Sequence, residues 1–70
     1  MLVSYGYEKI EVTGITWDKY SISLHQKEPS VEIIFETGDD TSSLVNKLFS
    51  DGYADLWKYP QRKRREDDEN

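Results

Sequence analysis

The stretch that decides the fold is VEIIFETGDDTSSLVNKLFSDGYADLWKYP, residues 31–60, because it holds most of the side chains that can build a core. Its first six residues alternate with a period of two, which predicts a β-strand. One face carries Val31, Ile33 and Phe35, and we expect it to face the core. The opposite face, expected to face water, carries Glu32, Ile34 and Glu36.

A short helix is predicted next in this stretch. Asp40 or Thr41 can cap its N-terminus, and Gly52 suits a left-handed C-terminal cap. Between these positions the apolar residues form one helical stripe of Leu44, Val45, Leu48 and Phe49. Residues 53–59 are rich in aromatic side chains and predict a further strand, which Pro60 ends.

The residues before this stretch predict shorter strands. Residues 7–13 and 20–24 alternate, residues 14–19 read as a loop, and residues 1–7 can add a strand at the edge. The short connection at 25–30 makes the strands on either side of it antiparallel neighbours. We therefore predict an α+β fold, with an antiparallel sheet of four or so strands and one helix packed on one face, in the order β-β-β-α-β.

Length and composition indicate one small domain. The 70 residues contain no cysteine, so the core must form without disulfides. We expect residues 1–60 to make a single compact α+β domain and residues 61–70, which lack any apolar side chain, to be a disordered charged tail. No apolar run is long enough to span a membrane and no secretory signal is recognisable, which predicts a cytoplasmic protein.

The charge of this chain is unevenly distributed. The net charge is -5, and all three arginines lie in residues 62–65, where four basic side chains are followed directly by four acids. The remaining residues hold ten acids against five lysines and no arginine. A nucleic-acid-binding domain needs Lys and Arg on one face, so this distribution favours a basic protein as the partner.

Catalytic and metal sites are not predicted. His25 is the only histidine, and no nucleophile or orienting acid can be assigned to it from the sequence. The acids around residues 39–51 lack the spacing of a calcium loop, so we expect no metal, no cofactor and no enzymatic activity. Four aromatic residues are candidates for core positions or for anchors at a protein interface: Trp17, Tyr53, Trp57 and Tyr59.

Small size, acidity and the absence of cysteine make residues 1–61 similar in style to phage host-takeover proteins, in particular to DNA mimics that inhibit nucleoid proteins of the HU type. This resemblance rests on charge and size and carries no motif. It implies a non-enzymatic inhibitor, a monomer or weak homodimer in the host cytoplasm, that covers the DNA-binding surface of a basic host protein and binds neither nucleic acid nor membrane. The predicted contact residues are Glu11, Glu32, Glu36, Asp39, Asp40 and the apolar Ile34.

Other functions stay open at this point. The first is a general protein-interaction module that uses an exposed strand edge or the Trp/Tyr surface. A nucleic-acid binder acting through residues 62–65 and a small enzyme are further alternatives, and the sequence offers little support for either.

Overall fold

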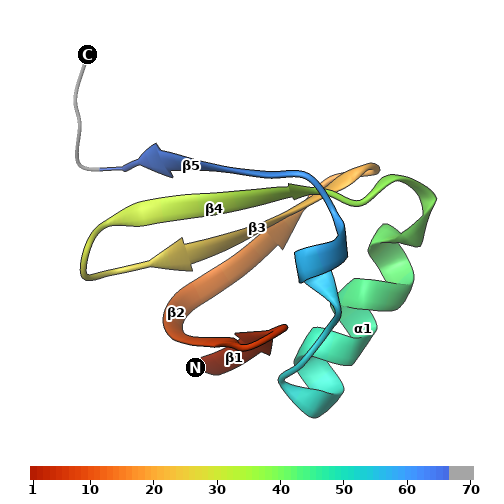
Figure 1. Ribbon diagram of the computed structural model, residues 1–70, viewed down its shortest axis with the longest axis horizontal. Coiled ribbons are helices and arrows are strands. Elements are labelled where there is room, and N and C mark those ends of the chain that lie inside the picture. Colours follow the sequence, from red (N-terminus) through yellow and green to blue (C-terminus); the bar gives the residue numbers. More distant parts are fainter. Residues whose placement is uncertain (67–70) are drawn as a thin grey trace.

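The computed structural model describes residues 1–66 and contains a five-stranded antiparallel sheet in the order β1-β2-β3-β4-β5, with helix α1 packed on one face (Figure 1). This confirms the predicted α+β class, with the extra strand at the start included. None of the helices in the described range is long and apolar enough to cross a membrane. The elements are β1 (Leu2–Tyr5), β2 (Glu8–Trp17), β3 (Ser21–Gln26), β4 (Val31–Glu36), the 3-10 helix η1 (Gly38–Asp40), α1 (Thr41–Asp51), the 3-10 helix η2 (Leu56–Lys58) and β5 (Gln61–Arg65).

The core lies between the sheet and the two helices α1 and η2. Alternation in β3 and β4 directs one set of side chains toward the helices, because residues two apart on a strand share a face. Antiparallel pairing then aligns Ile22 with Phe35 and Leu24 with Ile33. The side chains with almost no exposed surface are Val3, Val12, Ile22, Leu24, Ile33, Phe35, Leu48 and Leu56.

Helix α1 starts directly after Asp40, one of the two predicted N-cap residues, and buries three of the four residues of the predicted stripe. The fourth, Phe49, is 55% exposed. Leu44, Val45 and Leu48 are buried, and Gly52 ends the helix with φ of 70° and an N–H donated to the carbonyl of Leu48. Asp40 makes no side-chain capping bond. Its carboxylate instead accepts a hydrogen bond from the hydroxyl of Tyr59 at 2.6 Å.

The prediction of a loop at residues 14–19 is wrong, because strand β2 continues to Trp17. The pairing of β2 with β3 shifts register between Val12 and Gly14, so the chain passes the glycine in a bulge rather than in a turn. The turn follows at residues 18–20, where the Asp18 carboxylate accepts hydrogen bonds from the backbone N–H groups of Tyr20 and Ser21. These bonds lower the pKa of Asp18.

The C-terminal part of the sequence prediction needs two corrections. Residues 53–59 are not a strand: they form one bridge to β1 and then η2. The last strand is β5, at residues 61–65, which we predicted to be disordered. Strand β5 is exposed along its whole length and pairs with β4, so backbone hydrogen bonds rather than apolar burial hold it. The other part of the predicted tail, residues 67–70, lies outside the described residues.

A truncation tests the contribution of β5. A chain ending at Pro60 should be less stable than a chain ending at Glu66 by at least about 2 kcal/mol, because it loses several backbone hydrogen bonds that contribute about 0.5–1.5 kcal/mol each. Urea unfolding measures this difference, and hydrogen exchange should show faster exchange of the β4 amides. Equal midpoints for the two chains would show that β5 adds nothing to the fold.

Candidate functional site: an aromatic pocket with two carboxylates

The acids predicted as partner contacts do not form one surface, and Glu32 does not face open water. The Glu32 side chain keeps only 11% of its surface exposed. Its Oε1 accepts hydrogen bonds from Nε and Nη2 of Arg64 at 3.0 and 2.6 Å. This pairing lowers the pKa of Glu32, against the opposing effect of burial. Strand β5 therefore covers and neutralises the acid that was central to the predicted site.

Strand β5 also lies beside Glu36 and Ile34, the neighbours of Glu32 on the same face of β4. Glu36 is half exposed and lies 3.6 Å from Nη1 of Arg62. Ile34 is buried, with Ser23 and Arg62 as its cross-strand partners, so it is no exposed apolar contact. This face of the sheet carries mixed charges.

The other predicted contacts lie elsewhere. Glu11, in β2, binds the N-terminal ammonium group and shares a shallow cavity with Lys9 and Lys27. Asp39 and Asp40 are exposed in η1, between β4 and the helix. The structure thus does not bring the six predicted residues together.

The charge of the folded part also differs from the expectation. Residues 1–66 contain all nine Lys and Arg side chains but only eleven of the fourteen acids, which gives -2 instead of the -5 of the whole chain. The predicted arginine-free domain does not exist, because β5 belongs to the sheet. A uniformly acidic surface is therefore a poor description of this fold.

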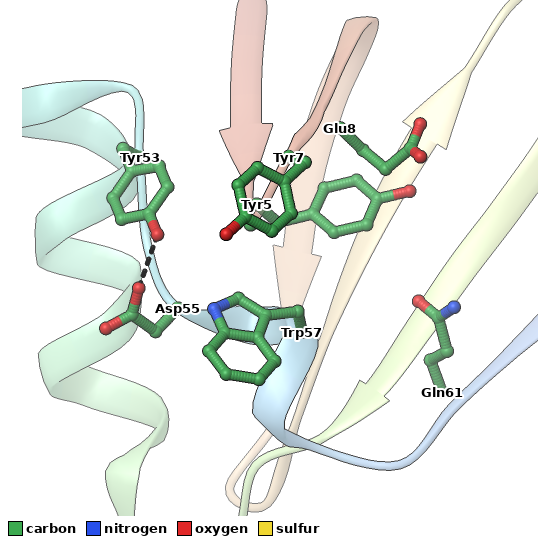
Figure 2. Close-up of a pocket in the computed structure, with 8 residues that line it drawn as sticks. Tyr5, Tyr7, Glu8, Tyr53, Asp55, Trp57 and Gln61 are labelled. Carbon is green, nitrogen blue, oxygen red and sulfur yellow. Dashed lines mark hydrogen bonds between the residues drawn. The ribbon is translucent and has the colours of Figure 1, made fainter.

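The most distinctive site is a pocket beside the turn between β1 and β2 (Figure 2). It has a volume of about 520 Å³, within the range typical of small-ligand pockets. In Figure 2, Tyr53 and Asp55 lie on one side of the pocket and Glu8 and Gln61 on the other, with Trp57 between them. The lining residues are Tyr5, Gly6, Tyr7, Glu8, Tyr53, Asp55, Trp57 and Gln61.

Two chain segments build this pocket. The first is the tight turn Gly6-Tyr7 between β1 and β2, and the second is the connection from α1 to β5, which contains η2. Gly6 has φ of +68°, and a Cβ there would meet Cδ1 of Trp57 at 2.9 Å. Only glycine therefore allows the indole to pack so closely on this turn. Backbone hydrogen bonds between Ser4 and residues 52 and 54 hold the two segments together.

The polar groups on the Tyr53 side of the pocket satisfy one another. The Tyr53 hydroxyl donates a short hydrogen bond to Oδ1 of Asp55, which raises the pKa of Tyr53. The Trp57 indole and the Gly6 backbone, which lie near the same hydroxyl, oppose that rise in pKa. Figure 2 accordingly shows the indole nitrogen of Trp57 on the side of Tyr53 and Asp55. This arrangement fixes the Tyr53 and Trp57 rings before any ligand arrives.

The rings that line the pocket differ in exposure. Tyr7 is fully exposed and Trp57 is 63% exposed, whereas Tyr5 is buried against Phe35 with ring centroids 5.3 Å apart. Burial and the nearby charge of Glu8 raise the pKa of Tyr5. The lining contains two carboxylates and no Lys or Arg. The pocket thus offers aromatic surface together with negative charge.

Sequence reasoning found only part of this pocket. It named Tyr53 and Trp57 as possible interface anchors but grouped them with Trp17 and Tyr59. The structure places Trp17 against Phe49, with ring centroids 5.8 Å apart, and binds Tyr59 to Asp40. The missed signal is the turn sequence Tyr5-Gly6-Tyr7-Glu8, where two tyrosines and an acid surround a glycine.

A second group of polar side chains lies on the sheet face opposite α1. Oγ1 of Thr16 lies 2.7 Å from Nε2 of His25, and Nδ1 of His25 lies 2.7 Å from Oε2 of Glu66. These are the hydroxyl and carboxylate that sequence reasoning could not assign to His25. A carboxylate only accepts hydrogen bonds, so Nδ1 carries a hydrogen. Neither the aromatic pocket nor the shallow cavity at Glu11 includes any of these three residues. The two interactions link β2, β3 and the residue that follows β5.

The pocket lining presents ring faces and two carboxylates. Within residues 1–66 no group of three or more His, Cys, Asp or Glu side chains could hold a metal ion. A platform that stacks nucleobases needs a basic groove, and this lining has the opposite charge. Aromatic faces and carboxylates together attract cations.

The pH dependence of stability should reveal the buried state of Glu32. Because its pKa is lowered in the folded protein, Glu32 contributes stability at pH values above its unfolded value near 4.5 and loses that contribution as pH falls through the folded value. Glu32→Gln should therefore differ most from wild type at pH 7, and the difference should shrink as the pH falls below about 4.5. Urea unfolding across this pH range measures it. Glu36→Gln is the matched control, and equal behaviour of both variants would contradict the assignment.

Packing of Trp57 on the turn can be tested at the glycine. Gly6→Ala should cost about 1–3 kcal/mol, because alanine at positive φ is strained and its Cβ collides with the indole. In a Trp17→Phe background it should also shift Trp57 fluorescence. Gly14→Ala is the control, since a Cβ there meets nothing within 4 Å. An unchanged Trp57 signal in Gly6→Ala would contradict the close packing.

Comparison with known proteins adds no family assignment, since no protein-family model, curated protein or solved structure matches this chain. The functional argument therefore depends on the geometry described above. Within that geometry, the pocket combines exposed rings, negative charge and a fixed backbone support.

Proposed function

We propose that this protein is a non-enzymatic binding module that recognises a basic partner protein through the aromatic pocket. The observation that carries this proposal is the pocket lining, in which exposed Trp57 and Tyr7 stand beside Glu8 and Asp55 without any basic side chain. This proposal combines the Trp/Tyr surface of the interaction module, the alternative hypothesis from the sequence, with the basic partner of the first hypothesis.

The energetics of interfaces support this choice. Binding energy concentrates in a few anchors, and Trp and Tyr are enriched among them. A preorganised ring adds affinity because less freedom is lost on binding, and Trp57 is held by Gly6 and by the Tyr53 network. Carboxylates at the pocket select a partner of opposite charge and speed its approach.

DNA mimicry by a host-takeover inhibitor is the second candidate. The net charge of -5 and the exposed acids Asp39 and Asp40 favour it. The ion pairs of Glu32 and Glu36 with arginines of β5 count against it, because they interrupt the row of acids that would imitate phosphates. Under this hypothesis the target is an HU-type nucleoid protein and duplex DNA competes for it.

Nucleic acid itself is a weaker candidate partner. Strand β5 does carry four consecutive basic side chains at the sheet edge. Arg62 and Arg64 already pair with glutamates, so their charge is partly neutralised.

We place the interaction in the cytoplasm. Disulfides are common in small proteins of oxidising compartments and rare in the cytoplasm, and this chain contains no cysteine.

A capture experiment tests the proposed function. The purified protein is used to capture binding proteins from a bacterial lysate, and binding of the captured protein is then titrated against salt. We expect a basic partner whose affinity falls with salt and falls at least tenfold in Trp57→Ala, because an anchor contributes about 2 kcal/mol or more. Circular dichroism verifies that the variant is folded.

The matched control is Trp17→Ala, which removes the other exposed tryptophan, outside the pocket, and should leave binding unchanged. Release of the partner by duplex DNA, with equal affinity for wild type and Trp57→Ala, would favour the mimic over the pocket. A neutral or acidic partner that is insensitive to salt would contradict both candidates.

A further inference from the structure

We propose that the aromatic pocket binds a methylated ammonium group, carried by a methylated lysine side chain of the basic partner. This inference deepens the proposed function and rests on it. It concerns which cation enters between the rings, a question that the net charge of the pocket leaves open.

The first step of the argument is the ring surface. Four aromatic side chains, Tyr5, Tyr7, Tyr53 and Trp57, line one pocket, and Tyr7 and Trp57 expose most of their surface. A cation within about 6 Å of a ring centre is attracted by the negative face of the ring, most strongly for Trp. Recognition of methylated ammonium groups by several rings at once uses the same physics.

The second step is charge. Glu8 and Asp55 belong to the lining, on opposite sides of the pocket (Figure 2), and the lining contains no Lys or Arg. A neutral apolar ligand would gain no attraction from the two carboxylates. A ligand with positive charge is attracted by both.

The third step separates ammonium from guanidinium. A guanidinium group presents five N–H donors and needs acceptors in matching positions. In this pocket Oδ1 of Asp55 already accepts the Tyr53 hydroxyl. Glu8 supplies the other carboxylate, and the rest of the surface is mainly ring. A methylated ammonium group, with few or no N–H donors, fits such a surface better.

The fourth step is preorganisation. Gly6 permits the indole to lie on the turn, where a Cβ would approach it to 2.9 Å. The Tyr53 ring is fixed through its hydroxyl, and Ala54 donates a backbone N–H to Ser4 at 3.3 Å. A cavity of about 520 Å³ that the two fixed rings, Tyr53 and Trp57, help to bound can accept a bulky cation without closing on itself.

Fluorescence titration of the full chain in a Trp17→Phe background, with Trp57 as the reporter, tests this inference. The small probes are choline and its neutral isostere 3,3-dimethylbutanol, at constant ionic strength. We expect choline to bind between about twofold and thirtyfold more tightly than the alcohol, which is the range of cation–π contributions. Equal binding of the two probes would overturn the inference, because it would show an apolar pocket indifferent to charge.

Basic peptides that differ at one residue identify the source of the cation. We expect the trimethyllysine peptide to bind more tightly than the lysine and arginine peptides of the same sequence, and more tightly than free choline. Tightest binding by the arginine peptide would overturn the inference. So would binding of choline without any gain from the trimethyllysine peptide, because the site would then serve a free small molecule.

Variants localise the site. Tyr7→Ala and Glu8→Gln should weaken binding of the trimethyllysine peptide severalfold, and because Tyr7 and Glu8 are exposed, both variants should fold. Tyr20→Ala and Glu28→Gln, which change exposed residues outside the lining, should have no effect. If Trp57→Ala abolishes capture of a basic partner while no methylated probe binds, the inference fails and the proposed function stands. If the probes bind and no basic partner is captured, the proposed function fails, and this inference fails with it.

Discussion

The pairing of β5 with β4 is the constraint on which the rest of this structure depends. Strand β4 is buried from Val31 to Phe35 on both of its faces, so neither its edge nor its outer face can be left to solvent. Strand β5 protects both surfaces. Its backbone pairs with the edge of β4, and its Arg64 side chain covers Glu32 on the outer face. Because α1 ends at residue 51 and β5 begins at residue 61, the connection must return along the end of the sheet. That path brings Trp57 against Gly6, and the pocket lies where these two segments meet.

The same pairing decides how charge is distributed. An arginine-rich segment that stood apart from the domain would leave an acidic body able to imitate DNA. Paired with β4, it places Arg62 and Arg64 among the glutamates of the outer face. Charge on a bare edge strand also hinders unwanted pairing with another chain. Carboxylates without an arginine partner therefore lie away from this face of the sheet. The pocket is one such place, because Glu8 and Asp55 line it and no basic side chain does.

Sequence reasoning succeeded where apolar periodicity carries the information. The strand at 31–36, the buried positions of α1 and the left-handed Gly52 all follow from patterns that a core imposes. Strand β5 carries no such pattern, because an exposed edge strand buries no side chain and its hydrogen bonds come from the backbone alone. The exposure of Glu32 was predicted wrongly for the same reason. Alternation along a strand predicts that its second face is exposed to solvent only when no other element covers that face. Of the pocket, sequence reasoning named Tyr53 and Trp57, but the local sequence could not show that residues 5–8 and 53–57 meet.

The pocket is better explained as a site than as a by-product of folding. Large exposed rings are common singly, but here a glycine at positive φ holds an indole in place at the cost of backbone freedom. A hydrogen-bonded Tyr53 and Asp55 fix the second wall, although neither is buried enough to need a partner for folding. Fixing solvent-exposed aromatic groups contributes little to stability, because they bury little surface. It does reduce the entropy lost when a ligand is enclosed, so the arrangement is favourable for a ligand that completes it.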